Sequence, residues 1–355
     1  MGGKEIDADV AVIGGGIIGL SIAFELSWRG ARVRVFDRDE PARAASWAAA
    51  GMLAPHTEMI EDASFRALCA DSLAMYPEFV SRLFAAGGID PHLRLDGILS
   101  TAFSEIEMED CAARWETLRR RSVKAQILDR DDVLRLEPSL ASTVRGGLLV
   151  ESEGQIDNRL LGRALLAACA ARGVTIHASA RDIALECDER RVLGVRSDQG
   201  FYPAGSVVNA CGAWASQLAG VPIDSVVEVE PVKGQMLALQ IPRGLIQRVV
   251  WAPGAYLVPR DDGRLLIGAT VEDIGFDTRV TARGVQSLLD AALRAAPALR
   301  DCALTEMWSG VRPSTPSGLP QIGATSIAGY FVAVGHYRNG ILLAPITARR
   351  MADAL

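Results

Sequence analysis

The first residues that could do chemistry are three glycines near the start of the chain. Gly14, Gly16 and Gly19 form a Gly-x-Gly-x-x-Gly motif between a short apolar run and a helical pattern, and Asp37 ends the next apolar run. In this context the first glycine permits a tight turn, the second lets the backbone approach a pyrophosphate, and the third allows close packing of helix on strand. A helix N-terminus favours the negative charge of the pyrophosphate, and the acid can accept hydrogen bonds from a ribose. The motif predicts a dinucleotide site, and a glycine turn in a nucleotide-free α/β fold is the alternative.

A run of small residues follows the acid and bears on which dinucleotide is bound. Residues 44–52 are mostly alanine, with Ser46 and Gly51 among them. Such small side chains would let backbone amides approach a planar ring edge-on, as an isoalloxazine requires, whereas a packed alanine helix is the plain alternative. Because the chain has one fingerprint, an enzyme that holds two dinucleotides in two separate folds is disfavoured. This segment alone leaves the choice between FAD and NAD open.

Composition excludes several classes of protein. The 355 residues can bury a large core and exceed the usual size of one domain, so we expect two domains. The net charge of −6 and the absence of basic clusters give no footprint for nucleic acid. We expect no membrane span, because no apolar stretch approaches about 18 residues, and no secretion signal, because residues 1–7 lack an apolar core. Six cysteines without paired spacing favour reduced thiols in a cytoplasm, and four histidines without ligand spacing favour no metal site.

The elements that must position these residues alternate between strands and helices. The chain opens as a βαβ unit with strands at 9–13 and 32–36 and a helix at 17–28. Residues 226–269 are rich in strand patterns and predict a separate, more antiparallel sheet. The pattern as a whole predicts an α/β protein with two interleaved domains. Helices are also expected within 65–121, at 158–172, at 282–295 and from about 341 to the end, and strands at 174–177, 183–186, 192–197, 205–209 and near Ile322 and Phe331.

Five further segments follow the fingerprint in a fixed order, at residues 48–53, 231–235, 268–270, 310–313 and 335–345. Together they resemble the glycine oxidases of thiamine biosynthesis, within the D-amino-acid oxidase (DAO) family. The resemblance spans nearly the whole chain, and its last segment is the most specific. It implies FAD as the cofactor, conversion of glycine to iminoglycine, and reduction of O2 to hydrogen peroxide. Because relatives are often tetramers, it also implies a homo-oligomer.

The resemblance also implies a division of the chain and a set of site residues. A Rossmann-like FAD-binding domain would comprise residues 1–85, 146–225 and 310–355, interleaved with a mixed-sheet substrate-binding domain of residues 86–145 and 226–309. Arg312, Arg338 and Tyr256 fall on substrate-contacting positions. Trp47 and Gly254 depart from the family pattern and could reshape the pocket. The residues assigned to FAD, in addition to Arg338, are Gly14, Gly16, Ile17, Ile18, Gly19, Asp37, Arg38, Ala45, Ser46, Ala50, Gly51, Met52, Asp182, His336, Tyr337, Asn339, Gly340, Ile341 and Leu342.

These residues suit hydride removal from a small amino acid. The guanidinium of Arg312 matches a carboxylate bidentately and stays charged at any working pH, and Tyr256 can add a hydroxyl donor. Orientation of Cα at flavin N5 would then supply much of the rate without a protein base. The amine must be neutral for the hydride to leave. Residues 339–341 are expected to start the last helix, whose N-terminus would stabilise negative charge at flavin N1 and the C2 carbonyl.

Two other readings stay open on the sequence. A dehydrogenase of the same fold would pass electrons to a quinone or a partner protein instead of O2, and a subunit that merely tethers FAD would do no chemistry. Retention of both Arg312 and Tyr256 disfavours the tethering subunit. Some relatives attach flavin through a cysteine near the position of Arg312; here the nearest is Cys302, so we expect a dissociable FAD.

Overall fold

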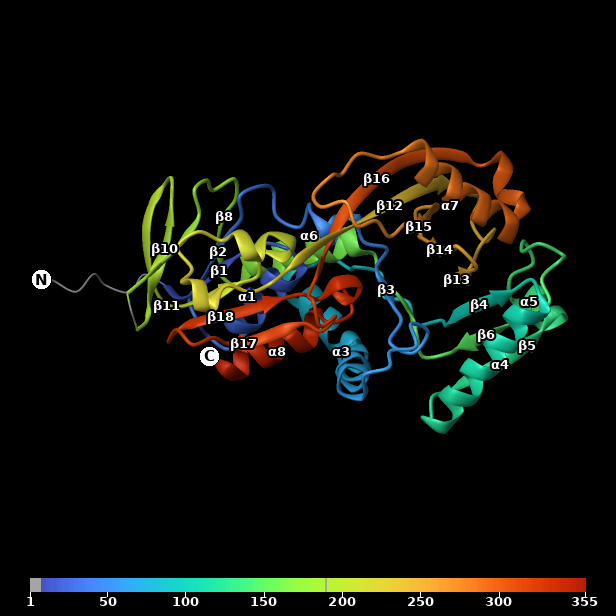
Figure 1. Cartoon of the computed structure of the whole chain (residues 1–355), viewed down its shortest axis with the longest axis horizontal. Helices are drawn as coiled ribbons and strands as arrows, with labels where there is room; N and C mark the ends of the chain where they lie inside the picture. Colours follow the sequence, from blue (N-terminus) through green and yellow to red (C-terminus); the bar gives the residue numbers. More distant parts are fainter. Residues whose placement is uncertain (1–7, 189) are drawn as a thin grey trace, which may run out of the picture.

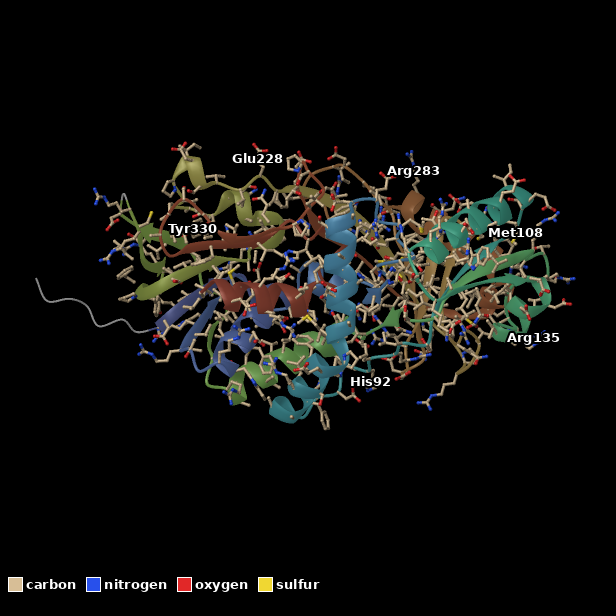
Figure 2. All side chains as sticks on the ribbon, turned by 90° about the horizontal axis from the view of Figure 1, so that it is seen from below. His92, Met108, Arg135, Glu228, Arg283 and Tyr330 are labelled. Atoms are coloured by element: carbon tan, nitrogen blue, oxygen red, sulfur yellow. The ribbon has the colours of Figure 1, made fainter. Side chains whose placement is uncertain are left out.

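The computed structural model describes residues 8–188 and 190–355. Residues 1–7, on which the expectation of no secretion signal depends, lie outside that part of the chain. Figure 1 shows two halves side by side, each built on one sheet, with the long strands β12 and β16 extending from the centre of the molecule into the second half. Figure 2, from a perpendicular view, places Tyr330 in the first half and Met108 and Arg135 at the far end of the second half.

The first sheet has the strand order β17-β18-β11-β1-β2-β8. Its neighbouring strands are parallel except β17, which runs antiparallel to β18. β1 is buried at nearly every position, as expected of a central parallel strand covered on both faces. Its strands are β1 (Ala8–Ile13), β2 (Val33–Phe36), β8 (Thr175–His177), β11 (Gly200–Asn209), β17 (Gln321–Ala324) and β18 (Tyr330–Val334), with β9 (Ala184–Cys187) and β10 (Val192–Ser197) as an antiparallel arm on β11.

Helices cover the first sheet and hold its glycine turn in place. α1 (Ile17–Trp28) begins directly after the turn and is buried over most of its surface. It packs against α8 (Ala344–Ala354) and α6 (Asn158–Ala171), and α6 packs against α3 (Ala63–Gly87). The apolar residues of these helices and of β1 and β2 form one continuous core, which fixes the start of α1 relative to the ends of the strands. Short helices complete this half: α2 (Ala45–Ala48), η1 (Gly212–Gln217), η2 (Ile223–Ser225) and η4 (Tyr337–Asn339).

The second sheet has the order β16-β12-β15-β14-β13-β4-β6-β5 and is antiparallel except where β13 meets β4. α7 (Ala282–Ala295) packs an apolar stripe against this sheet. The short pair β3 (Met52–Leu53) and β7 (Gly154–Gln155) lies between the halves. The remaining elements of this half are β4 (Ile98–Ala102), β5 (Ala125–Asp129), β6 (Gly146–Val150), β12 (Glu230–Gln240), β13 (Val249–Ala252), β14 (Ala255–Pro259), β15 (Arg264–Gly268), β16 (Ala303–Ser314), α4 (Glu105–Arg120), α5 (Arg130–Leu136) and η3 (Pro297–Asp301).

The α/β fold with two mixed sheets confirms the predicted fold class, but two predicted elements were wrong. β4 interrupts the segment predicted to be helical. All five of its residues are buried although Ser100 and Thr101 are polar, so its sequence lacks the alternation of apolar and polar residues that marks a half-buried strand. The last helix begins at Ala344 rather than near 341, because residues 337–339 form a 3-10 turn and Tyr337 has a positive φ of 48°. Pro345 then occupies the first turn of α8, where its missing N–H costs nothing.

Nothing in the structure tests the predicted division into domains, which stays a prediction. β6 pairs with β4 and β5 of the second sheet, although the predicted boundary at 146 assigned it to the FAD-binding part. The boundary at 310 falls within β16, so that strand belongs to both predicted domains.

Candidate active site

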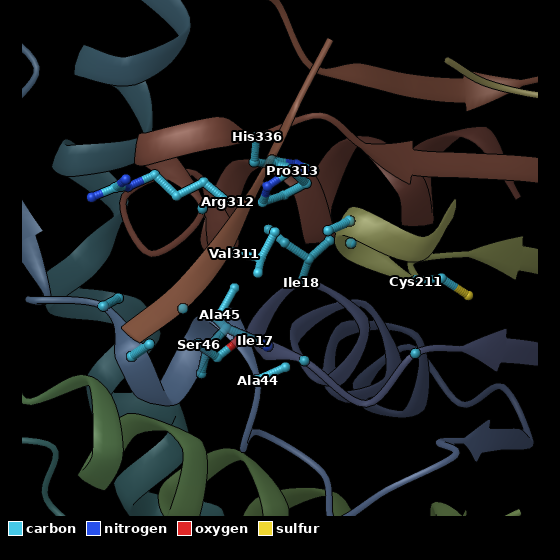
Figure 3. Close-up of a pocket in the computed structure, with 18 of the residues that line it drawn as sticks. Ile17, Ile18, Ala44, Ala45, Ser46, Cys211, Val311, Arg312, Pro313 and His336 are labelled. Atoms are coloured by element: carbon cyan, nitrogen blue, oxygen red, sulfur yellow. Dashed lines mark hydrogen bonds between the residues drawn. The ribbon is translucent and has the colours of Figure 1, made fainter. Parts of the chain in front are cut away.

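A cavity of about 720 Å³ lies where the two sheets meet. Its wall includes the carboxyl end of β1, the start of α1, and residues of β12, β14 and β16. Figure 3 shows Ser46 and Ile17 on one side, Val311 and Pro313 on the other, and Cys211 at the end away from Arg312. This volume is within the usual range for ligand sites, and ligands of α/β sheets bind at the carboxyl ends of parallel strands.

The glycine motif has the geometry that its spacing predicts. Gly14 has a φ of +105°, and an ideal Cβ there would lie 2.3 Å from the carbonyl oxygen of Ala210. A Cβ on Gly19 would lie 1.9 Å from the carbonyl oxygen of Gly14. The backbone of α1 therefore packs directly against the backbone of the turn, with no room for a side chain between them. The N–H of Ile17 donates to Oγ of Ser46 at 2.9 Å, which ties the start of α1 to the small-residue segment.

The acid after β2 is held by backbone groups. Oδ2 of Asp37 accepts from the N–H of Gly15 at 2.7 Å, and Oδ1 accepts from the N–H of Asp39 at 2.9 Å. Burial raises the pKa of Asp37, and these hydrogen bonds oppose that rise. Each carboxylate oxygen keeps a further lone pair, so Asp37 can still accept from a ribose. The guanidinium of Arg38 lies 4.1 Å from the ring centroid of Trp214 beside the same end of the cavity.

Most of the predicted site residues line this cavity. Three do not, and each has a packing role in the structure: Gly19 contacts Gly14, Asn339 donates to Glu58 at 3.3 Å, and Leu342 is buried in the core of the first half. The predicted residues that line the cavity are Gly14, Gly16, Ile17, Ile18, Asp37, Arg38, Ala45, Ser46, Ala50, Gly51, Met52, Asp182, Tyr256, Arg312, His336, Tyr337, Arg338, Gly340 and Ile341. Their assignment to FAD or substrate stays a prediction.

Arg312 on β16 is held by backbone carbonyl groups rather than by an acid. Its Nη1 donates to the carbonyl oxygens of Lys233 and Thr270, both at 3.2 Å, and its guanidinium lies directly over Gly234. Neutral acceptors orient the guanidinium without cancelling its charge. The charge therefore remains available to an anionic ligand in the cavity.

Tyr256 on β14 faces the same part of the cavity. Its hydroxyl donates to Sδ of Met236 at 3.3 Å, and burial raises the pKa of Tyr256 even though the charge of Arg312 opposes the rise. The hydroxyl is therefore protonated at neutral pH and can act as a hydrogen-bond donor.

Glu58 and Arg260 are two residues of the site region that the sequence did not predict. Glu58 lies in the turn after β3 and lines the cavity; its Oε1 is 3.8 Å from Nε of Arg338. Arg260 is buried between the halves, where Nη2 donates to the carbonyl oxygen of Ala50 at 2.7 Å and to Oδ1 of Asn158 at 3.0 Å. Neither has a sequence signal, because both follow strand ends with no motif and meet their partners only in the folded chain.

The two departures from the family pattern lie outside the cavity lining. Trp47 packs against the guanidinium of Arg159, whose Cζ is 3.7 Å from the Trp47 ring centroid, and against the edge of Trp308. Gly254 forms the turn between β13 and β14 with a φ of +87°. Both residues therefore belong to the structure around the cavity and do not form part of its wall.

Two other groups at the cavity are held in their neutral forms. Burial lowers the pKa of His336 to about 3, and its Nε2 shares a hydrogen bond with Oγ1 of Thr347. Burial raises the pKa of Cys211 to about 12, and Cys211 is the one cysteine among the cavity residues of the described chain. Cys302 lies elsewhere, so a dissociable FAD stays our prediction. In the described residues, no helix is both long and apolar enough to cross a membrane.

A glycine turn at a strand end, an acid after the second strand and an arginine facing the same cavity define a nucleotide-dependent enzyme of the two-sheet flavoprotein type. The chain belongs to the FAD dependent oxidoreductase (DAO) family, whose model matches residues 9–354. This confirms both the predicted family and FAD as the cofactor. Gly14, where a Cβ would overlap Ala210, makes the turn tight, and Gly16 and the start of α1 line the cavity beside it, which fits the binding of a pyrophosphate.

Individual relatives are similar along the whole chain. The chain is 41% identical to a bifunctional protein ThiO/ThiG of Synechocystis sp., over 98% of this chain and 51% of that protein. It is 37% identical to a glycine oxidase of Geobacillus kaustophilus, over 97% of this chain and 92% of that protein. The crystal structure of glycine oxidase from Geobacillus kaustophilus matches with a TM-score of 0.92 over 98% of this chain and 94% of that chain. The chain spans about half the length of the bifunctional relatives that it matches.

Proposed function

We propose that this protein is an FAD-dependent oxidase that removes a hydride from Cα of glycine, or of a similarly small amine such as sarcosine or D-alanine. The observation that carries this proposal is the placement of Arg312 and Tyr256 on the wall of the cavity that also contains the glycine motif. Bound FAD would supply the acceptor for the hydride, and O2 would then take up both electrons to give hydrogen peroxide. The amino acid leaves as its imine, which water hydrolyses.

The residues of the chain act by binding and orienting the substrate. The guanidinium of Arg312 receives the substrate carboxylate, and the hydroxyl of Tyr256 donates to the same group. Two fixed points on one carboxylate determine the direction of Cα, and such orientation accounts for a large share of the rate in reactions of this kind. The amine must lose its proton before the hydride leaves, so we expect activity to rise with pH through the ionisation of the bound amine.

The test is anaerobic mixing of the FAD-loaded protein with glycine, sarcosine or D-alanine, followed by admission of air. Loss of the flavin absorbance with glycine, and its recovery with one peroxide per turnover, would support an oxidase. Loss without recovery in air would point to a dehydrogenase that needs a quinone or a partner protein. No loss with any of the amines would refute the function.

We also propose a cytoplasmic homo-oligomer. All six cysteines are free thiols, which suits a reducing compartment. Size-exclusion chromatography with light scattering would test the oligomer, and a monomer at micromolar concentration would contradict it. A role in thiamine biosynthesis is proposed from the bifunctional relatives.

A further inference from the structure

An amino acid carries a negative carboxylate and a positive ammonium group. The residues around Arg312 suit only the carboxylate. Arg312, Arg338 and Tyr256 are all cationic or hydrogen-bond donors, so they suit the carboxylate and not the ammonium group. A positive group placed among them alone would be repelled. The cavity must therefore present an acceptor near Arg312 if it is to favour amino acids over simple carboxylic acids.

The acidic residues that line the cavity fall into two groups by their place in the fold. Asp37, Asp39, Glu40 and Asp182 lie in the loop after β2 or just before β9, close to the glycine motif. Glu58 comes from a different segment, the turn between β3 and α3, and lies beside Arg338. Burial raises the pKa of Glu58, and the charges of Arg338 and Arg312 and the hydrogen bond from Asn339 oppose that rise.

Glu58 has acceptor capacity that its protein partners do not use. Its side chain is 14% exposed, Nε of Arg338 is 3.8 Å from Oε1, and Nδ2 of Asn339 donates to Oε2 at 3.3 Å. Both separations are longer than those of a strong charged hydrogen bond, and a carboxylate can accept about four. A carboxylate that is withdrawn from water and only loosely paired gains from a further cation.

We propose that Glu58 binds the ammonium group of the substrate and thereby makes the site select amino acids over carboxylic acids that lack an amine. This inference rests on the proposed function and names the partner of the second substrate charge. Arg312 and Glu58 then hold the two ends of one zwitterion. Because the ligand is held at both ends, Cα has one orientation in the cavity.

The test is Glu58→Gln, which keeps the shape and an acceptor for Asn339 and removes the charge. The apparent Kd of glycine is taken from the rates of anaerobic flavin bleaching, and the inhibition constant of acetate, which has the carboxylate and no amine, is measured against glycine. We expect glycine to bind about tenfold to a hundredfold more weakly, the range for one charged hydrogen bond. Acetate should bind equally well or better, because a neighbouring negative charge has been removed.

Two further variants make the result interpretable. Glu61→Gln removes a charge from an exposed residue three positions further on and should leave both constants unchanged. Glu58→Asp keeps the charge with a shorter reach and should restore part of the preference for glycine; it also decides the matter if Glu58→Gln fails to retain FAD.

Equal weakening of glycine and acetate, or no weakening of either, would overturn the role of Glu58. Failure of the unmodified protein to be bleached by any amine would instead refute the proposed function.

Discussion

Adding one methyl group beneath Arg312 should disable the site without removing any functional group. An ideal Cβ on Gly234 would lie 2.3 Å from Nη2, 2.5 Å from Nη1 and 2.6 Å from Cζ of Arg312. Carbon and nitrogen atoms that are not bonded need about 3.5 Å, so in Gly234→Ala the guanidinium must move by about 1 Å. A misplacement of about 1 Å can cost about a hundredfold in rate, or roughly 2.7 kcal/mol. We expect kcat/KM for glycine to fall by about that factor.

The fold should tolerate this change, because the displaced atoms are the free end of a long side chain. Thermal unfolding and FAD content should therefore stay close to those of the unmodified protein. The control is a double-mutant cycle with Arg312→Ala: if the methyl group acts through Arg312, it should have little further effect in the Arg312→Ala background. A fall in kcat/KM of less than threefold for Gly234→Ala would refute the reasoning. A full effect in both backgrounds would mean that the methyl group acts by filling the cavity.

Three further predictions concern the cofactor cradle and the buried charges. Gly14→Ala should weaken FAD binding by more than tenfold, because it forces a φ of +105° on a residue with a Cβ and drives that Cβ into Ala210; the flavin content of the purified protein measures it. Arg260→Leu should destabilise the protein by about 3 kcal/mol, because it leaves buried acceptors unpaired. The assay is thermal unfolding of the FAD-loaded protein, and an unchanged midpoint would contradict the prediction. Burial raises the pKa of Glu153 from 4.5 to about 7. The folded protein therefore holds this proton more tightly than the unfolded chain does, and the stability that it contributes is complete below pH 4.5 and is lost as the pH rises through about 7. Glu153→Gln should flatten that part of the profile of unfolding temperature against pH.

The parts of the fold that the sequence predicted share strong local patterns. α1 and α7 were predicted with the bounds that the structure gives them, because the glycine turn and Thr281, whose side chain caps Gly284, mark their starts. β4 was missed because its cause is not local. All five of its residues are buried between β13 and β6, and β13 lies more than a hundred residues further along the chain, so tertiary pairing decides that this segment is a strand.

The candidate site divides in the same way. The cavity residues on the glycine turn and after β2 could be predicted, because the local backbone conformation requires each of these residue types at its position. Glu58 could not be predicted, because its place on the cavity wall depends on the pairing of β3 with β7 and on Arg338 at the other end of the chain. Arg260 is a similar case, since its acceptors lie on Ala50 and Asn158.

The small-residue segment 44–52 could be interpreted either as a surface beside a flat cofactor or as a packed alanine helix. The structure shows why the sequence could not separate the two. Ala45, Ser46 and Ala50 line the cavity, as a segment beside a flat cofactor would. Ala48 also lines it, but an ideal Cβ on Gly310 of β16 would lie only 2.4 Å from Cβ of Ala48, so these two residues set how closely the halves approach. Trp308, two positions earlier on β16, donates its indole N–H to the carbonyl oxygen of Ala48 at 3.1 Å. The strand that carries Arg312 is therefore fixed against the segment assigned to FAD, and the same small side chains serve both packing and cofactor approach. The contact between β16 and α2 therefore sets how far Arg312, the proposed carboxylate ligand, lies from the segment assigned to FAD.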